Sequence, residues 1–223
     1  MHLTLFNGSP RGKSSNTKIL LERLVEGFST YKGNTNEVHY LIFQKDMESF
    51  VEAFSRAENV ILAFPLYTDA MPGIVKLFIE RLQPFIGREG NPGLGFIVQS
   101  GFPETIHSRF VERYLEKLAR RLGCKYLGTV IKGGIEGIQA RPNWMNRKVF
   151  RRFRCLGKRL AKSGRFNPRL IRRLAGRRER LSGFSIKMYN LLRKTGMFDS
   201  YWNNMLRENK AFNDRYARPY RDS

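Results

Sequence analysis

The first 140 residues alternate between short runs typical of β-strands and stretches with the apolar spacing of helices. Four helical stretches separate five β-rich runs. Strict alternation of this kind predicts an α/β fold, with a parallel sheet covered by helices on both faces. The five predicted strands are His2–Phe6, Glu37–Ile42, Val60–Phe64, Leu94–Gln99 and Tyr126–Lys132.

Each helical stretch carries an apolar stripe that we expect to face the sheet. Hydrophobic residues make up 41% of the chain, which is enough for a sizeable core and argues against global disorder. The four stripes are Leu20, Leu21, Leu24 and Phe28; Phe50, Ala53, Phe54 and Ala57; Val75, Phe78, Ile79 and Leu82; and Phe110, Tyr114, Leu118 and Leu122.

The charge of the chain is unevenly distributed. The formal net charge is +22; residues 1–140 contain 17 Lys+Arg and 14 Asp+Glu, whereas residues 141–223 contain 24 and 5. The β pattern also stops near residue 140. We therefore predict a sheet domain over residues 1–140 and a basic α-helical extension over residues 141–223 that packs on it.

Helical spacing continues through the basic extension. Asn167-Pro168 is typical of a helix start, and further helices are predicted over Ser182–Gly196, with Gly196 as a stop, and over Tyr201–Glu208. The apolar residues at helical spacing are Val149, Phe153, Leu156 and Leu160; Leu170, Ile171 and Leu174; and Met188, Leu191 and Leu192, the last three expected to face inward.

Several classes of protein are disfavoured by the composition. Cys124 and Cys155 lie far apart without ligand-like spacing, so we expect reduced thiols and no metal site. Met1–Phe6 has no basic lead and no long apolar stretch, so we expect no signal peptide. No run approaches roughly 18 apolar residues, so we expect no membrane span and a soluble, cytoplasmic protein.

The loops that follow the strands are the places to look for function. Ligands of doubly wound sheets bind beyond the carboxyl ends of the strands, at the point where the strand order reverses. These loops begin at Asn7, Pro65, Ser100 and Gly133. No arrangement typical of a Ser-His-Asp or Cys-His catalyst appears, and of the three histidines only His107 falls near such a loop.

The first loop, Asn7–Thr17, follows a strand and opens a helix. Small hydroxyl and amide side chains are packed around two glycines in it, with two cations. Backbone N–H groups, hydroxyls and cations together favour a phosphate monoester; an ordinary helix N-cap is the alternative, although a cap needs only one such residue. Only three residues separate Gly8 from Gly12, whereas the P-loop that binds nucleoside triphosphates has four residues between its glycines, so the spacing does not fit.

Four motifs, each after a predicted strand, resemble those of the flavodoxin-like NAD(P)H-dependent FMN reductases and NAD(P)H dehydrogenases (quinone). The resemblance covers nearly the whole chain and includes Tyr201-Trp202 and Arg218-Pro219-Tyr220 near its end. It implies a flavodoxin-like, doubly wound, five-stranded parallel sheet with strand order 2-1-3-4-5. The motifs are Gly8-Ser9-Pro10-Arg11 with Ser15-Asn16-Thr17; Phe64–Pro72 with Lys76 and Arg81; Gln99–Glu104; and Gly133–Gly137.

The resemblance also implies a cofactor and its binding residues. FMN would be the cofactor, with NAD(P)H as co-substrate. The residues implied for the FMN phosphate are Ser9, Arg11, Ser15, Asn16 and Thr17. Those implied for the edge of the flavin ring are Pro65, Leu66, Tyr67 and Thr68, and those for its other side are Ser100, Gly101 and Phe102. A core role for Tyr67 or Phe102 is the alternative.

The chain also departs from the family pattern. Many relatives carry a cysteine-rich insert between the second and third strands, whereas here Leu41–Met47 leads almost directly into the next helix. We therefore expect no iron–sulfur cluster. The cover over that side of the flavin must be short or come from another subunit, so a homodimer is expected, with the basic helices and the Tyr201–Tyr220 tail as candidate interface.

The leading hypothesis is an FMN-dependent NAD(P)H oxidoreductase that passes electrons by ping-pong hydride transfer to a quinone, flavin or other small aromatic acceptor. One alternative is a non-enzymatic electron carrier of the flavodoxin type. Another is a protein that binds anions or nucleic acid on a flavodoxin fold. The sequence leaves open the acceptor, NADH or NADPH, the oligomer size and any contact of His107 with substrate.

The basic segment, residues 147–180, admits three interpretations. It could be a solvated helix face, an attractor for anionic NADPH, or a contact for nucleic acid or an anionic membrane surface. Nucleic acid is not favoured at this stage, because the Leu and Phe residues between the arginines are accounted for by packing and no aromatic free to stack on bases is evident.

Overall fold

The computed structural model describes residues 1–176, 180, 182–194 and 199–218. The chain divides into two compact units, Met1–Arg180 and Leu181–Ser223, and each is considered separately. The boundary expected at residue 140 and the packing of the whole extension remain predictions; the first unit itself continues past that residue, to Arg180.

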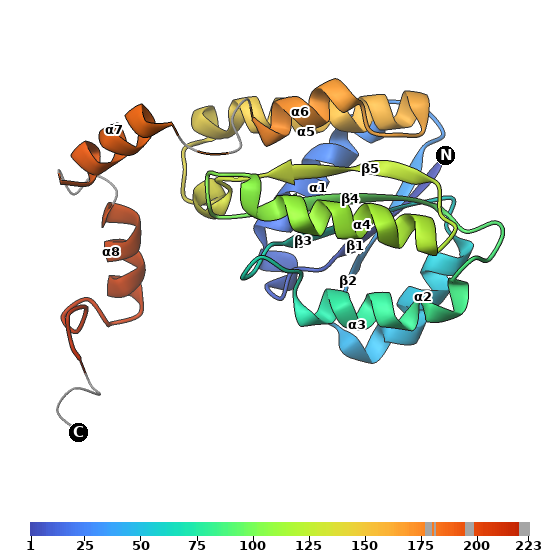
Figure 1. The fold of residues 1–223 in the computed structure, drawn as a ribbon, viewed down its shortest axis with the longest axis horizontal. Coiled ribbons are helices and arrows are strands. Elements are labelled where there is room, and N and C mark those ends of the chain that lie inside the picture. Colours follow the sequence, from blue (N-terminus) through green and yellow to red (C-terminus); the bar gives the residue numbers. More distant parts are fainter. Residues whose placement is uncertain (177–179, 181, 195–198, 219–223) are drawn as a thin grey trace. The chain divides into compact units, whose positions relative to one another are not determined.

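The first unit is built on a five-stranded, fully parallel sheet with order β2-β1-β3-β4-β5 (Figure 1). Fold class and strand order are as predicted. The observed strands agree with the predicted ones to within two residues at each end: β1 His2–Asn7, β2 Thr35–Tyr40, β3 Asn59–Pro65, β4 Gly93–Gln99 and β5 Tyr126–Lys132.

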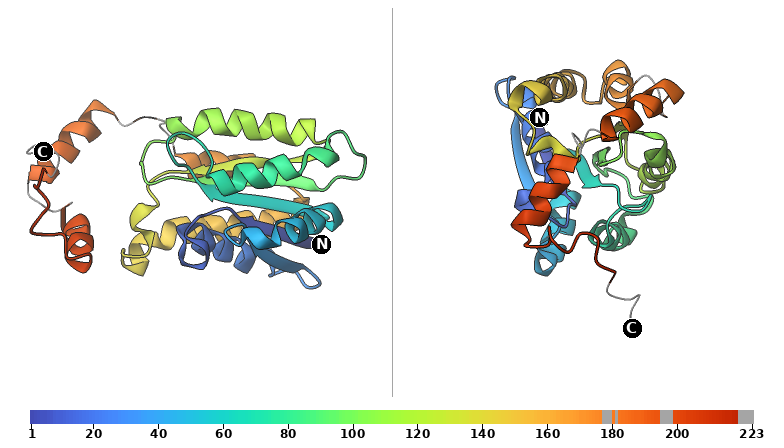
Figure 2. Two further views of the ribbon diagram at one scale, coloured as in Figure 1. Left: turned by 90° about the horizontal axis from the view of Figure 1, so that it is seen from below. Right: turned by 90° about the vertical axis from the view of Figure 1, so that its left-hand side faces the viewer.

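Six helices cover the sheet in two layers. Residues of α2, α3 and α4 form one core cluster with one face of the sheet, and residues of α1, α5 and α6 form a second cluster with the other face. Figure 2 shows α3 and α4 on the opposite side of the sheet from α1 and α5. The helices are α1 Asn16–Phe28, α2 Met47–Arg56, α3 Gly73–Arg81, α4 Arg109–Arg121, α5 Asn143–Ser163 and α6 Pro168–Ala175.

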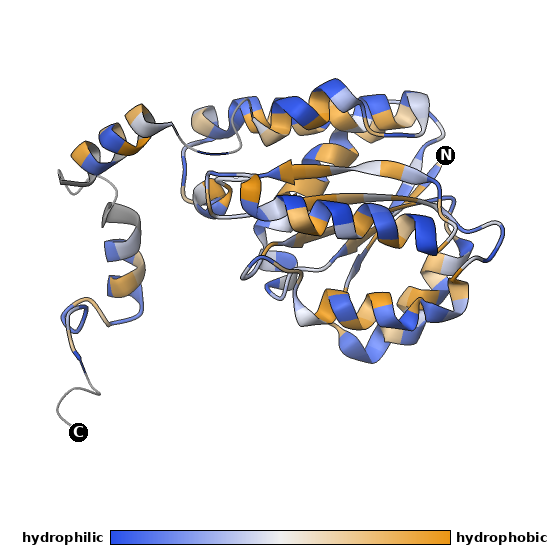
Figure 3. Cartoon of the chain, in the orientation of Figure 1, coloured by the Kyte–Doolittle hydropathy of each residue, from blue (hydrophilic) through white to orange (hydrophobic). Residues whose placement is uncertain are grey.

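The central strand β3 explains why both faces need a cover. Its seven residues are all buried. Successive side chains of a strand point to opposite faces, so Val60, Leu62 and Phe64 join the first cluster while Ile61 and Ala63 join the second. Figure 3 shows the helices with hydrophobic and hydrophilic residues on different faces, as this three-layer packing requires.

Helices α1 and α5 pack unusually closely, through one glycine on each. A Cβ atom on Gly27 would lie 1.9 Å from the carbonyl oxygen of Arg154, and one on Gly157 would lie 1.9 Å from the carbonyl oxygen of Leu24. Neither position therefore has room for a side chain. The contact makes α5, which lies beyond residue 140, an integral layer of the sheet domain.

The predicted apolar stripe of α4 is wrong in part. Phe110 is 71% exposed and Tyr114 45% exposed, whereas Val111, Leu115 and Ala119 are buried. The two stripes run side by side along the helix, one residue apart. The structure turns Val111, Leu115 and Ala119 toward the sheet and the aromatic residues away from it.

The second unit contains α7 (Gly183–Lys194) and α8 (Asp199–Glu208). The prediction that Met188 and Leu191 face inward is wrong, because they are 41% and 61% exposed. A unit this small has little interior in which to bury them. The side chain of Leu192 and residues Gly196 and Pro219-Tyr220 lie outside the described residues. No helix in the described part of the chain is long and apolar enough to span a membrane.

Candidate functional site

The strand order reverses between β1 and β3, and a pocket lies beyond their carboxyl ends. The chain leaves β1 for α1 on one face of the sheet and leaves β3 for α3 on the other, so the loops that follow the two strands diverge. The pocket is lined by eight of the twelve residues predicted for the cofactor site: Ser9, Arg11, Asn16, Pro65, Leu66, Tyr67, Ser100 and Gly101.

The remaining four predicted residues do not line this pocket. Ser15 and Thr17 are buried beneath the first loop, and Thr68 is exposed in the loop after β3. Phe102 is 65% exposed, and its ring centre lies 5.4 Å from that of His107. Two further lining residues, Gln99 and Glu136, were not predicted, although both fall inside motifs that the sequence analysis identified.

The buried side chain of Asn7, at the end of β1, shapes the first loop. Its Oδ1 accepts a hydrogen bond from the backbone N–H of Ser9 (3.0 Å), and its Nδ2 donates to Oγ of Ser15 (3.1 Å). Gly8 follows, where a Cβ atom would lie 2.2 Å from Val75. One amide therefore connects the end of the strand to the start of α1.

Ser15 caps helix α1. Its Oγ accepts from the backbone N–H of Lys18 (3.1 Å) and donates to the carbonyl oxygen of Gly12 (2.7 Å). In the described structure the backbone N–H groups of Asn16 and Thr17 have no hydrogen-bond acceptor. A helix N-terminus with two unused donors carries a partial positive charge and attracts an anion.

The carboxamide of Asn16 joins the first loop to the loop after β5. Its Nδ2 donates to the carbonyl oxygens of Ile135 and Glu136, each 3.2 Å away, and its Oδ1 accepts from Nε2 of Gln139 (2.8 Å). Thr17 is also engaged within the protein, because Nε2 of Gln99 lies 3.4 Å from its hydroxyl. These two side chains hold the pocket together.

A tight turn forms the edge of the pocket after β3. Tyr67 and Ala70 exchange two backbone hydrogen bonds (2.9 and 3.0 Å), and the residues between them, Thr68 and Asp69, have φ angles of 47° and 62°. Left-handed φ at two consecutive non-glycine residues is costly. The turn leaves Tyr67 47% exposed beside the pocket and leaves the N–H groups of Thr68 and Asp69 without an acceptor among the described residues.

The loops after β4 and β5 hold each other in place. The N–H of Gly134 donates to the carbonyl oxygen of Phe102 (2.8 Å), and that of Ile135 donates to the carbonyl oxygen of Ser100 (2.9 Å). A Cβ atom on Gly133 would lie 2.5 Å from the Phe102 carbonyl oxygen, so the approach needs glycine there. The N–H groups of Gly101 and Phe102 have no acceptor in the part of the chain that the structure describes.

Charged side chains lie around the rim. Nδ1 of His107 is 3.4 Å from the Asp69 carboxylate, and its Nε2 is 3.7 Å from that of Glu104. At the end of β5, burial lowers the pKa of Lys132, as do, to a smaller extent, the nearby Arg152 and Arg141. Among the described residues no group of His, Cys, Asp and Glu is arranged to hold a metal ion.

The parallel order β2-β1-β3-β4-β5, with helices on both faces and a switch point between β1 and β3, places the chain in the class of doubly wound α/β proteins. The model of the protein family with the flavodoxin-like fold matches residues 1–148, and the chain belongs to this family. The resemblance noted from the sequence is thereby confirmed at the level of the family. No curated protein matches the chain.

Solved structures show the same fold. An FMN-dependent NADH-azoreductase from Bacillus anthracis, solved in complex with FMN, is 15% identical with a TM-score of 0.56; the match covers 72% of this chain and all (100%) of that one. An NAD(P)H:quinone oxidoreductase from Methanothermobacter marburgensis is 18% identical with a TM-score of 0.58, covering 72% and 96%. The Trp repressor binding protein from Bacillus subtilis is 25% identical with a TM-score of 0.53, covering 72% and 98%.

Proposed function

We propose that the protein is an FMN-dependent NAD(P)H oxidoreductase. The observation that carries the proposal is the pocket at the switch point, where loops after four strands bring together an anion-attracting helix start, an exposed tyrosine and unused backbone donors. An azoreductase and a quinone oxidoreductase with this fold support the choice of chemistry.

The first loop suits a phosphate monoester. The hydroxyl of Ser9, the guanidinium of Arg11 and the unused N–H groups of Asn16 and Thr17 would bind its oxygens. Ser15, Asn16 and Thr17 would contribute through the conformation that their side chains hold, since those side chains already have partners inside the protein. The site thus contains donors and one cation, as an FMN phosphate requires.

The other loops suit a flat, polar-edged ring. Tyr67 would provide a wall on one side, and the N–H groups of Thr68, Gly101 and Phe102 would face the polar edge of the ring, where negative charge develops on reduction. When bound, FMN supplies hydride chemistry that couples oxidation of a reduced nicotinamide to reduction of a small aromatic acceptor, in two half-reactions. Pro65 and Leu66 lie buried beneath the same edge.

The rim is open toward solvent, with Tyr67 and Phe102 both exposed in the single chain. We propose that a second copy of the chain covers this side, as the missing insert after the second strand suggests. A quinone, flavin, nitro- or azo-aromatic compound would then enter between the subunits.

The experiment that tests the function is a visible spectrum of the purified protein with and without added FMN, followed by anaerobic addition of NADPH. Binding of oxidised FMN that is bleached by NADPH, with a later return of the spectrum on addition of a quinone, supports the reductase. Binding without bleaching by NADPH or NADH indicates an electron carrier instead. Absence of FMN binding at micromolar protein refutes the proposal.

A further inference from the structure

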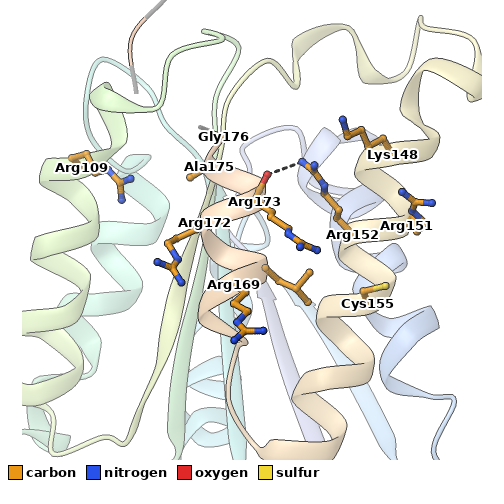
Figure 4. Close-up of a pocket in the computed structure, with 11 residues that line it drawn as sticks. Arg109, Lys148, Arg151, Arg152, Cys155, Arg169, Arg172, Arg173, Ala175 and Gly176 are labelled. Atoms are coloured by element: carbon orange, nitrogen blue, oxygen red, sulfur yellow. Dashed lines mark hydrogen bonds between the residues drawn. The ribbon is translucent and has the colours of Figure 1, made fainter. Parts of the chain in front are cut away.

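A large basic groove lies between α5 and α6 and reaches the start of α4 (Figure 4). Its volume is about 1310 Å³. Of the 11 residues that line it, seven are Arg or Lys and none is Asp or Glu. The groove is larger than typical small-molecule pockets, which run to roughly 1,000 Å³. Because all of its charged lining residues are cations, it fits an extended anion.

Arg109 at the edge of the groove pairs with Glu112, but four other cations of the groove are not neutralised by the described parts of the chain. Lys148 and Arg151 on α5 and Arg169 and Arg172 on α6 are exposed, and no described carboxylate forms a salt bridge with any of them. Arg152 is held in place by donating to the carbonyl oxygen of Arg173 (2.6 Å). Guanidinium groups predominate, and they pair with phosphate oxygens in a fixed two-pronged geometry.

The row of cations continues along α5 beyond the groove. Arg159 and Lys162 are exposed further along the helix, two and three turns after Arg151. A compact nucleotide carries only a few charges and would neutralise one end of this row. A chain with one phosphate per repeating unit would neutralise all of it, and each contact would release bound counterions.

Apart from Trp144 and Met145 in the first turn of α5, the large apolar side chains of these helices that face the sheet are not offered to a membrane. Phe153, Leu156 and Leu160 of α5 and Leu174 of α6 are at most 1% exposed, because they pack on the sheet and on α1. Surface-bound amphipathic helices need an exposed apolar face. The cations here also line a concave groove, which a flat bilayer reaches poorly.

An exposed aromatic side chain lies at the N-terminal end of the row of cations on α5. Trp144 is 75% exposed in the first turn of α5 and lies one helical turn before Lys148, so the two share a side of the helix. The sequence suggested no aromatic residue free to stack on bases; the structure exposes this one. A stacking platform beside a basic groove is the combination found in proteins that bind single strands.

We propose that the α5–α6 groove binds single-stranded nucleic acid without sequence preference, with the sugar–phosphate backbone along the arginines and a base stacked on Trp144. This inference needs no flavin and stands apart from the oxidoreductase function.

The direct test is fluorescence anisotropy with a labelled twelve-nucleotide oligo(dT) and the full chain. The triple variant Arg151→Glu, Arg169→Glu, Arg172→Glu should bind at least tenfold more weakly than wild type, with a shallower dependence on salt. The matched control is Lys32→Glu, Lys45→Glu, Lys125→Glu, which changes the net charge equally on exposed residues elsewhere. It should stay within about threefold of wild type, and circular dichroism should show that both variants are folded.

Two further measurements locate the bound oligonucleotide on the protein. Trp144→Ala should weaken binding of the single strand about tenfold, as loss of one stacked base implies, whereas Trp144→Phe should restore most of it. Cys155 lines the groove and is exposed, so the oligonucleotide should slow its modification by N-ethylmaleimide several-fold. A duplex of the same length should bind more weakly, because its paired bases are not free to stack.

Three results would overturn the proposal. The first is an equal loss of binding in the groove variant and in the matched control, which would mean that only the net charge matters. The second is binding to phosphatidylserine vesicles without binding to the oligonucleotide. The third is unchanged reactivity of Cys155 when the oligonucleotide is saturating.

Discussion

The carboxamide nitrogen of Asn16 lies 3.2 Å from the carbonyl oxygen of Ile135, so the loop after β1 and the loop after β5 are joined across 119 residues of sequence. The bond is buried, and the same amide also contacts Glu136 and Gln139. Asn16 therefore helps to fix the positions of the loops after two different strands, together with Gln139, whose Nε2 also donates to the carbonyl oxygen of Ser14 (3.0 Å).

Asn16→Ala should destabilise the protein by about 2 kcal/mol, because it removes three hydrogen bonds of the side chain, including the one to the carbonyl oxygen of Glu136. The carbonyl oxygen of Ile135 would keep its hydrogen bond from the N–H of Ile138. Asn16→Asp should be at least as damaging, since a carboxylate would face those oxygens. Urea unfolding measures the change in the free energy of unfolding. Asn36→Ala, at an exposed position of β2, is the control and should change it by less than about 0.5 kcal/mol; equal effects at both positions would contradict the role of Asn16.

Arg11→Ala should weaken binding of FMN by about tenfold, which corresponds to about 1.4 kcal/mol for the loss of one exposed charge-assisted contact. Binding of riboflavin, which lacks the phosphate, should not change. Fluorescence titration with both flavins separates a phosphate contact from a general defect, and Lys32→Ala is the control for loss of a distant charge. A parallel loss of affinity for both flavins would place Arg11 elsewhere in the site.

Gly157→Ala should cost about 3 kcal/mol or more, because the new methyl group would overlap the Leu24 carbonyl oxygen and force α5 away from α1. Thermal unfolding followed by circular dichroism measures the loss. Gly73→Ala is the matched control: a Cβ atom there has nothing within 4 Å, and the variant should unfold near the wild-type temperature. Normal stability of Gly157→Ala would mean that the helices are further apart than described.

A fragment of residues 1–140 should fail to fold, whereas a fragment of residues 1–180 should fold cooperatively. The shorter one lacks Phe153, Leu156 and Leu160, which form the second core cluster together with α1. Size-exclusion chromatography and urea unfolding of the two fragments test this. A monomeric, cooperatively unfolding 1–140 fragment would instead support a domain boundary where the charge distribution changes.

The buried thiol of Cys124 makes the free energy of unfolding depend on pH. Burial raises the pKa of its thiol from 9.0 to about 11, so folding favours the protonated form. The resulting stabilisation is complete below about pH 9 and is lost as the pH rises through 11. The difference in unfolding free energy between wild type and Cys124→Ala should therefore shrink by about 2 kcal/mol over that range. In the folded protein at pH 8, N-ethylmaleimide should modify the exposed Cys155 and spare Cys124; rapid labelling of both thiols would contradict the burial.

Most of the fold could be predicted, because apolar residues are spaced differently along the sequence in the strands and in the connecting helices. Val60 to Phe64 form a continuous apolar run, as a strand buried on both faces must. The face of α4 could not be predicted, because two adjacent stripes are both apolar. Only the assembled fold shows that Val111 is buried and Phe110 is exposed.

The candidate site was predictable where residues carry a recognisable loop pattern. Ser9 and Tyr67 lie where their motifs place them, beside the pocket. The organising role of Asn7 was not foreseen, since its partners, Ser9 and Ser15, become neighbours only when the loop closes. Trp144 was also missed: an aromatic residue at a helix start looks like core in a sequence, and only the fold shows which side it occupies.

The close contact between α1 and α5 can form only late in synthesis, because α5 is made long after α1. Ribosomes add about 5–20 residues per second, so α1 must wait roughly 7–27 seconds before the helix that covers it has been made. During that interval the side of α1 that later packs on α5, at Leu24 and Gly27, is uncovered. Nascent chains of this protein should therefore depend on chaperones until residue 163 has left the exit tunnel, and codon changes that slow translation between residues 140 and 163 should lower the soluble yield.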